Sequence, residues 1–315
     1  MFSRFKLALT ASAAAALCAC TGANDAPAAN AQAEKPAEKA AATSDAPSVE
    51  ITDLGAGLYM IKGQGGNVGV AVGPDSVLVI DDQFARMSTA ILSAIADITD
   101  KPVAYMINTH YHGDHTGGNQ NFAAAGATII AHDNVHKRMS ETQKSDLFDR
   151  ETPPSAVSAR PHITFSDTTT FQTAGQKAKI HHVPGAHTDG DSIIHFEDAN
   201  VIHMGDNFFH NMFPYIDTAA GGSIKGMIAA HQKALDLSDA ATQIIPGHGP
   251  MADKADLQAA QNLLKKIRAR VQARINAGNT LEEAISADPL KGMESYAAFI
   301  DKDNMVKAAY MSLTQ

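Results

Sequence analysis

The sequence predicts a mixed α/β domain in which two β-rich halves form a sandwich of two sheets with helices on the outside. Hydrophobic residues make up 44% of the 315 residues and charged residues 19%, a balance that can fill a substantial core. Short β-rich runs divided by Gly, Pro and Asp occur in both halves of the chain. Residues with helical spacing follow the strands in each half.

The first half alternates strands with one clear helix. Met87, Ile91, Ile95 and Ile98 recur at the spacing of a helix face. The expected strands of this half are residues 57–62, 68–72, 77–81, 103–108 and 128–131.

The second half starts again after a polar stretch around residues 140–160. Ile224, Ile228 and Leu235 indicate a helix between its strands. The expected strands are residues 179–183, 192–196, 200–204 and 242–245. Residues 253–275 and 280–313 are both expected to be helical, with Gly278 as the break between them.

The N-terminus predicts export. Arg4 and Lys6 precede an apolar stretch of signal-peptide length, and Leu17-Cys18-Ala19-Cys20 resembles a bacterial lipobox with Cys20 as the lipidated residue. We expect residues 1–20 to be a lipoprotein signal peptide, 21–48 a flexible tether, and 49–315 the folded domain with its C-terminal helices from about 253. The expected location is the membrane surface facing the periplasm, and ordinary secretory cleavage to a soluble periplasmic protein is the alternative.

Charge and composition exclude several classes of partner and mechanism. The formal charge of −9 argues against nucleic acid, because phosphate binding needs a basic surface. No 18-residue apolar run follows the first twenty residues, so we expect membrane contact through the lipid on Cys20 only. The chain has no G-x-S-x-G elbow and no P-loop, which disfavours a serine hydrolase and a nucleotide-binding protein.

The strongest chemical signal is a cluster among the fourteen histidines. His110-x-His112-x-Asp114-His115 places four metal-ligand side chains within six residues at the end of an apolar strand. Imidazole nitrogen and carboxylate oxygen suit zinc and similar divalent ions. The sequence therefore predicts a metal site at this strand end.

Three further candidates, His187, Asp206 and His248, each follow an apolar run and lie among glycines. Together with the first cluster they make a set of seven. Seven ligands are too many for one tetrahedral zinc, whereas two ions that share a bridging carboxylate would use them all.

These motifs resemble the metallo-β-lactamase superfamily of hydrolases over roughly Val49 to Pro250. The resemblance implies a four-layer αββα sandwich with the site at one edge, and two Zn²⁺ ions per chain. It also implies that Asp206 bridges the ions. The implied ligands are His110, His112 and His187 for one zinc, and Asp114, His115 and His248 for the other.

The chain differs from antibiotic-hydrolysing members at two positions. Their best-known subclass has a cysteine where Asp206 stands and a substrate-gripping lysine three residues later, where this chain has Phe209. Asp206 instead resembles the bridging residue of glyoxalase-type thioesterases. Lys225 is a candidate replacement for the lysine, although an exposed position on a helix face is the alternative.

The predicted function is an exported dinuclear zinc hydrolase that acts on a small ester, lactam, thioester or phosphoester. Two neighbouring ions lower the pKa of a shared water and so generate hydroxide, which Asp114 is expected to orient as the catalytic residue. Two alternatives remain open at this point: a mononuclear iron enzyme of the persulfide-dioxygenase type, and a non-catalytic zinc-binding lipoprotein. Oxygen-reducing di-iron members carry glutamate where His112 stands, which argues against that chemistry.

Three other residues are weaker candidates. Asp81 ends a strand and either anchors a metal ligand or caps the following helix. His210 lies just after Asp206 and either contacts substrate or is a plain loop residue. His231 falls on the apolar face of its helix, which favours a structural role.

Overall fold

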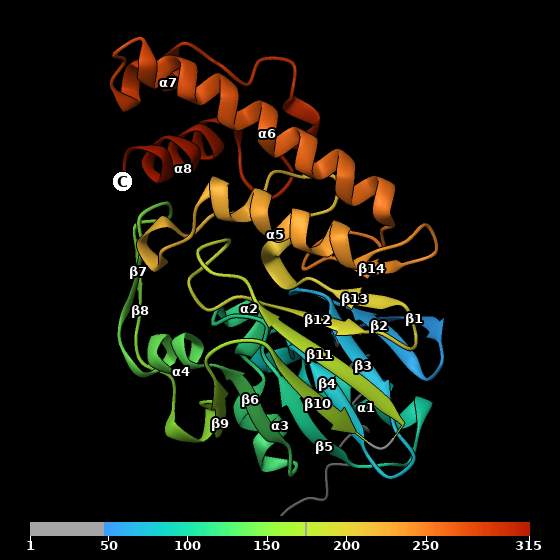
Figure 1. Cartoon of the computed structure of the whole chain (residues 1–315). Coiled ribbons are helices and arrows are strands. Elements are labelled where there is room, and N and C mark those ends of the chain that lie inside the picture. Colours follow the sequence, from blue (N-terminus) through green and yellow to red (C-terminus); the bar gives the residue numbers. More distant parts are fainter. Residues whose placement is uncertain (1–46, 174) are drawn as a thin grey trace, which may run out of the picture. The chain divides into compact units, whose positions relative to one another are not determined.

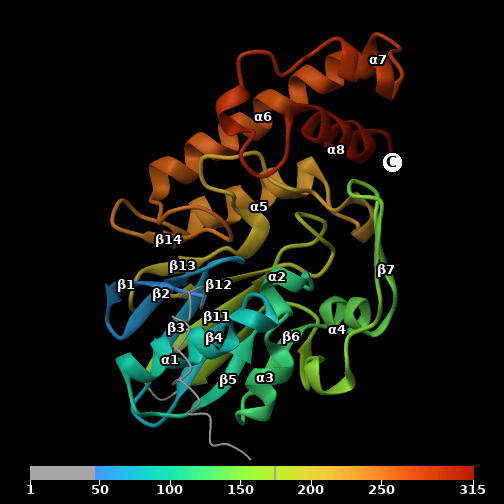
Figure 2. The same cartoon turned by 180° about the vertical axis from the view of Figure 1, so that it is seen from behind.

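The structure is a computed structural model that describes residues 47–173 and 175–315. The predicted signal peptide, Cys20 and most of the predicted tether lie outside these residues. The unit from Ala46 to Gln315 contains two large sheets that pack face to face (Figures 1 and 2). The seven-stranded sheet has the order β1-β2-β3-β4-β5-β6-β9 and the five-stranded sheet the order β10-β11-β12-β13-β14.

Most neighbouring strands in the two sheets are antiparallel, and the strands that precede the site pair in parallel. The seven-stranded sheet comprises β1 (Glu50–Gly55), β2 (Leu58–Lys62), β3 (Val68–Val72), β4 (Val77–Ile80), β5 (Val103–Ile107), β6 (Thr128–His132) and β9 (Ile163–Phe165). The five-stranded sheet comprises β10 (Thr169–Thr173), β11 (Gln176–His182), β12 (Ser192–Phe196), β13 (Val201–His203) and β14 (Gln243–Ile245). Strand β4 pairs in parallel with β5, and β13 with β14.

Helices cover the outer face of each sheet, which gives the αββα arrangement that the sequence predicts. The helices on the side of the seven-stranded sheet are α1 (Ser88–Ile98), α2 (Gly113–Thr116), α3 (Asn119–Ala124) and α4 (Asp133–Ser140). Those on the side of the five-stranded sheet are α5 (Ile224–Leu237), α6 (Lys254–Asn276), α7 (Leu281–Ser286) and α8 (Lys302–Thr314), drawn in orange to red in Figure 1.

Strand alternation explains why both faces of each sheet are apolar. In β4, Leu78 and Ile80 point into the core between the sheets, whereas Val77 and Val79 pack with Ile91 of α1 on the outer face. Because successive side chains of a strand point to opposite faces, a strand buried on both sides reads as a continuous apolar run. Such runs made these strands recognisable in the sequence.

The C-terminal region differs from the expected continuous helix over residues 280–313. The helix ends at Ser286, and a loop runs to α8, which begins at Lys302. Within this loop Asp288 has a φ of 42° and Gly292 a φ of 82°, and Pro289 lacks the N–H that a helix interior requires. Apolar residues at helical spacing continue across the loop. Periodicity alone therefore predicts one helix that is longer than either of the two helices in the structure.

The polar stretch around residues 140–160 also contains structure that the sequence did not predict. A small antiparallel hairpin pairs β7 (Gln143–Ser145) with β8 (Arg150–Thr152), and it stands next to α4 in both views of the fold (Figures 1 and 2). Among the described residues, no helix is long and apolar enough to cross a membrane.

The two sheets bring their site-bearing loops to the same edge. Asp81 follows β4, the His110 cluster follows β5, Asp206 follows β13 and His248 follows β14. The carboxyl ends of parallel strands meet at one edge of a sheet, which is where open α/β sheets bind ligands.

Candidate metal centre

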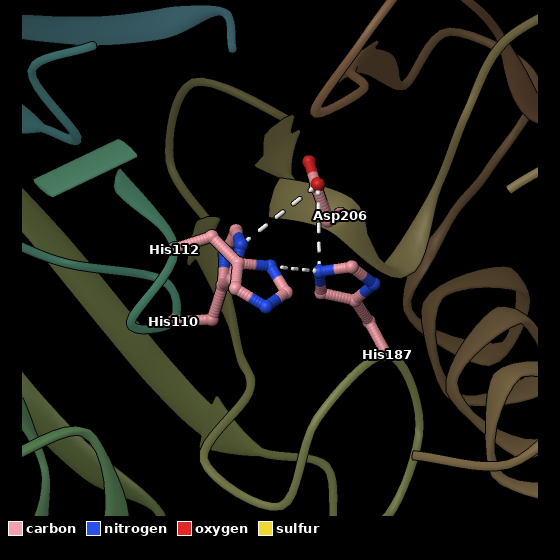
Figure 3. A group of neighbouring side chains, drawn as sticks. All are labelled: His110, His112, His187 and Asp206. Atoms are coloured by element: carbon pink, nitrogen blue, oxygen red, sulfur yellow. Dashed lines mark hydrogen bonds and ion pairs between the residues drawn. The ribbon is translucent and has the colours of Figure 1, made fainter. Parts of the chain in front are cut away.

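The structure brings all seven predicted site residues together in two adjoining groups. The first group contains His110, His112, His187 and Asp206; Figure 3 shows His110 and His112 on one segment, with His187 and Asp206 reaching them from other loops. The second group contains Asp114, His115 and His248. Within each group, one potential ligand atom from every residue lies within 4.8 Å of the others.

Asp206 lies between the two groups and directs one carboxylate oxygen toward each. Its Oδ2 is 3.5 Å from His187 Nε2 and 3.8 Å from His110 Nε2. Its Oδ1 is 3.0 Å from His115 Nε2 and 3.4 Å from His248 Nε2. The carboxylate can therefore reach a ligand position on both sides.

The outer nitrogens of His112 and His187 are fixed by hydrogen-bond acceptors. His112 Nε2 lies 2.9 Å from Asp217 Oδ2, and His187 Nδ1 lies 2.8 Å from the carbonyl oxygen of Tyr215. A neutral imidazole carries one proton, so donation outward leaves the inner nitrogen with a bare lone pair. Those inner nitrogens, His112 Nδ1 and His187 Nε2, face each other at 2.8 Å. Two lone pairs at that separation repel unless a cation lies beside them.

Asp81 fixes the rings of two other histidines in the same way. Its carboxylate accepts from His115 Nδ1 at 2.8 Å and from the hydroxyl of Thr109 at 2.7 Å. Because the Thr109 hydroxyl donates to Asp81, its oxygen is free to accept from His110 Nδ1 at 3.0 Å. The Nε2 atoms of His110 and His115 are thereby directed into the cluster.

The donor set fits divalent metal ions. His110 Nε2 is buried and has no hydrogen-bond partner among the described residues, which would be costly in a site that held no cation. Imidazole lone pairs that face inward beside carboxylates are typical of metal-binding histidines when an acceptor holds the outer nitrogen, as it does in His110, His112, His115 and His187. The site therefore has the ligand types, the burial and the outer hydrogen bonds that a metal centre requires.

The protein's own charges keep the carboxylates ionised. Burial alone would raise the pKa of Asp206, but His115 and His248 hold that pKa well below its usual range. Burial opposes the ionisation of Asp114 as well, yet the same two histidines lower the pKa of Asp114 to about 2. Burial lowers the pKa of His187 to about 4, so this ring is neutral at pH 7. Although burial opposes it, the carboxylates in turn raise the pKa of His248 to about 9 and the pKa of His115 well above its usual range, so both rings carry a proton that a metal ion would displace on binding.

Glycines allow the backbone to approach Asp206 closely. Gly205 has a φ of 51°, and a Cβ there would collide with Thr109. A Cβ on Gly247 would overlap Asp206 Oδ1. The glycines that surround these ligands in the sequence therefore have a steric reason to be there.

A cavity of about 1150 Å³ opens over the cluster, and its lining includes His112, Asp114, Asp206 and His248. The β7–β8 hairpin forms part of its wall. This volume accommodates a small-molecule substrate.

The structure places the weaker sequence candidates in different roles. Asp81 is the anchor of His115 and does not cap the following helix, whose N-cap is Phe84. Lys225 is exposed on α5 and does not line the cavity, and neither does His210, whose Nδ1 lies 3.0 Å from the carbonyl of Pro250. His231 has a structural role, since its Nε2 donates to the carbonyl of Asn207 at 2.7 Å and steadies the loop that carries Asp206.

Sequence reasoning missed the role of Asp217. Its Oδ2 accepts hydrogen bonds from His112 and from the Tyr111 hydroxyl, the latter at 2.6 Å. It also caps a short turn by accepting from the backbone N–H of Ala220. An acidic residue at the start of a turn is common, so the sequence holds no signal for the contact with His112.

An αββα sandwich that carries facing His/Asp groups at one edge has the architecture of a metal-dependent hydrolase. The family model of the metallo-beta-lactamase superfamily matches residues 61–258. The chain belongs to this superfamily.

Curated relatives are distant. The chain is 23% identical over 252 residues to the lactamase-like protein aptB of Emericella nidulans, a match that covers 72% of each protein. It is 30% identical over 108 residues to a hydroxyacylglutathione hydrolase of Methylococcus capsulatus, which covers only 34% of each.

Solved structures agree on the fold. A metallo-beta-lactamase from Pontibacter korlensis superposes with a TM-score of 0.57 at 18% identity, and covers 69% of this chain and 99% of that protein. The stereoselective inverting sec-alkylsulfatase Pisa1 from Pseudomonas sp. gives a TM-score of 0.64 at 16% identity, and covers 83% of this chain and 50% of that enzyme.

Proposed function

We propose that the protein is a dinuclear zinc hydrolase. The observation that carries this proposal is the position of Asp206, whose two oxygens face the two ligand groups separately. In this assignment His110, His112 and His187 hold one zinc ion. Asp114, His115 and His248 would hold the other, and Asp206 would contribute one carboxylate oxygen to each site.

The residues of the chain have distinct roles in this reaction. When bound, the metal ions would polarise the scissile group and lower the pKa of a water at the site. Asp114 lines the cavity, 3.2 Å from His248 Nε2, where one carboxylate oxygen can bind metal and the other can orient the attacking water. Asp81 and Asp217 keep the histidine rings in the tautomers that bind metal.

The bond type that we propose is a small ester, lactam, thioester or phosphoester. The relatives support this breadth, since their names describe a hydroxyacylglutathione hydrolase, a lactamase-like protein and an alkylsulfatase. Efficient β-lactam turnover is not expected. Phe209, which stands in place of the gripping lysine, is buried against His248 with the ring centroids 5.0 Å apart.

His248 is the residue that separates the two-metal proposal from a single-iron dioxygenase. A mononuclear site would leave this histidine without a metal role. Instead its Nε2 lies 3.2 Å from Asp114 and 3.4 Å from Asp206, within the second group. Its placement supports the two-metal proposal.

We further propose that the enzyme is exported and works at a membrane surface in the periplasm. The support is the sequence alone, because Leu17-Cys18-Ala19-Cys20 and most of the predicted tether lie outside the described residues. A lipid on Cys20 would hold the enzyme while the tether left the cavity in water.

A hydrolysis panel on zinc-loaded protein tests the proposal. It would contain an aryl ester, a lactone, a thioester, a phosphodiester and several β-lactams, each assayed before and after removal of metal with a chelator. Metal-dependent turnover of at least one of these classes is expected, and restoration by zinc should follow. Activity that survives complete metal removal would contradict the proposal, as would the absence of turnover in protein that holds two zinc ions.

A further inference from the structure

The charges that line the cavity suggest which substrates it accepts, and this inference rests on the proposed function. Each acidic side chain that lines the cavity already interacts with other side chains. Asp114 and Asp206 belong to the cluster, and Asp217 is bound by His112 and Tyr111. Glu151 pairs with Lys144 at 2.7 Å.

Only some of the cationic side chains that line the cavity form ion pairs. Arg138 forms an ion pair with Asp189 at 2.7 Å. Arg150 and Lys62 also line the cavity, and among the described residues neither takes part in an ion pair or a side-chain hydrogen bond. The chain has a formal charge of −9. Even so, the charged side chains that line this cavity without an ion-pair or side-chain hydrogen-bond partner among the described residues, Arg150 and Lys62, are both positive.

The hairpin directs Arg150 toward the site. Arg150 pairs across the hairpin with Ser145, and side chains of directly opposed residues project from the same face. Ser145 reaches inward, because its hydroxyl lies 2.9 Å from the hydroxyl of Tyr215. Tyr215 in turn stacks on the ring of His112, with centroids 5.5 Å apart. Two side chains, Ser145 and Tyr215, therefore link Arg150 to His112 of the metal cluster.

Aromatic side chains provide an apolar surface in the same cavity. Phe148 in the turn of the hairpin is 47% exposed, and its ring centroid is 5.1 Å from that of Tyr215. Phe299, in the loop before α8, is 41% exposed and lies 4.8 Å from the ring of His248. Large apolar side chains left open to water beside a site are suited to contact a ligand.

We propose that Arg150 is a specificity-determining residue that binds an anionic group on the substrate, away from the bond that is cleaved. The substrate class is an amphiphilic anion: an ester or related compound with an apolar body and a carboxylate or similar group at its far end. A guanidinium suits this task because it presents two parallel donors to a carboxylate.

Two matched esters test this inference. The probes are 4-acetoxybenzoate, which is an anion at pH 7, and its neutral methyl ester, methyl 4-acetoxybenzoate; release of acetate is measured for both. We expect wild type to prefer the anion by about tenfold or more in kcat/KM, the size of effect that a charged hydrogen bond gives. Arg150→Gln should remove most of that preference, chiefly through KM, and leave turnover of the neutral ester within about twofold.

Two further variants make the comparison specific. Arg150→Lys should recover part of the preference, because it restores the charge without the planar fork. Arg268→Gln, which removes an exposed arginine on α6 outside the cavity wall, should change neither ester. An unchanged ratio of the two kcat/KM values in Arg150→Gln would overturn the inference and leave the proposed hydrolase function intact.

A binding measurement covers the case in which neither ester is hydrolysed. Calorimetry with 4-hydroxybenzoate and its methyl ester needs no turnover. Tighter binding of the anion to wild type, lost in Arg150→Gln and kept in Arg268→Gln, would uphold the anion site even if the proposed reaction were wrong. Equal binding of the anion to wild type and Arg150→Gln would overturn it.

Discussion

Asp217 Oδ2 lies 2.9 Å from His112 Nε2 and so determines which nitrogen of that histidine faces the metal cluster. The two residues are far apart in the sequence: His112 lies after β5 of the seven-stranded sheet, and Asp217 lies after β13 of the five-stranded sheet. The carboxylate is 2% exposed, and the Tyr111 hydroxyl also donates to it at 2.6 Å. This contact holds His112 Nδ1 toward His187 as a lone pair.

Asp217→Asn should weaken metal binding about 10- to 100-fold. The carboxylate uses its Oδ1 to accept from Ala220 N–H, at 3.1 Å. An asparagine that keeps this cap must direct its NH₂ group at His112, which would favour the wrong tautomer. Zinc affinity measured by competition with a chelating dye checks this. Tyr111→Phe keeps the carboxylate and is the control, with a smaller loss expected; equal affinities for Asp217→Asn and wild type would contradict the account.

Gly66→Ala should disturb the second ligand group although it replaces none of the proposed ligands. A Cβ at this position would overlap the ring of His115, which is fully buried and cannot move away freely. A ligand displaced by about 1 Å costs on the order of 100-fold in rate, so kcat/KM should fall by roughly that factor. Gly113→Ala is the matched control, because a Cβ there meets nothing within 4 Å. Similar activities of the two variants would refute the steric argument.

The buried His231 should make the fold sensitive to acid. Burial lowers the pKa of His231 to about 4, from the value of 6.5 that is usual for a solvated histidine. Between those values the unfolded chain binds a proton that the folded chain does not, so the free energy of unfolding decreases as pH falls from 6.5 toward 4. One such proton corresponds to ~1.4 kcal/mol per pH unit.

His231→Gln should reduce this acid sensitivity while remaining able to donate to the Asn207 carbonyl. The measurement is urea unfolding of both proteins at several pH values across that window, with metal removed. At neutral pH the variant should be less stable than wild type, because its packing is altered. As the pH falls, its free energy of unfolding should decrease less steeply than that of wild type, by the contribution of about one proton. Parallel stability curves for the two proteins would show that His231 does not titrate in this way.

The proposed lipid on Cys20 has a direct cellular test. Two or more acyl chains, each contributing about 0.8 kcal/mol per buried methylene, would hold the protein at membranes. Cys20→Ser should therefore move the protein from the membrane fraction to the soluble fraction, whereas Cys18→Ser, two residues away, should leave it at the membrane. Unchanged fractionation of Cys20→Ser would contradict the anchor.

The two-sheet architecture and the seven clustered side chains could be predicted because their signals are local. Strands buried on both faces read as apolar runs, and each potential ligand stands where such a run ends, as His110 does after β5 and Asp206 after β13. The resemblance to a known family then implied that these residues lie together, and in the structure they form two adjoining groups.

What the sequence did not predict depends on contacts between distant segments. The partnership of Asp217 with His112 joins a turn to a loop 105 residues earlier. The β7–β8 hairpin is made of polar residues whose strands are three residues long, too short for a period-2 pattern to be visible. The break near Pro289 was overlooked because apolar residues continued at helical spacing on both sides of it.

Metal content of wild type and Asp206→Ala is the most direct test of the central claim, that one carboxylate joins two ion sites. Wild type should hold close to two zinc ions per chain. Asp206→Ala should hold close to one, because the three histidines of the first group remain while Asp114, His115 and His248 lose their link, and activity should fall much further than stability. His248→Ala should give the same stoichiometry. Wild-type protein that holds a single iron, with full metal and full activity retained in His248→Ala, would contradict the claim.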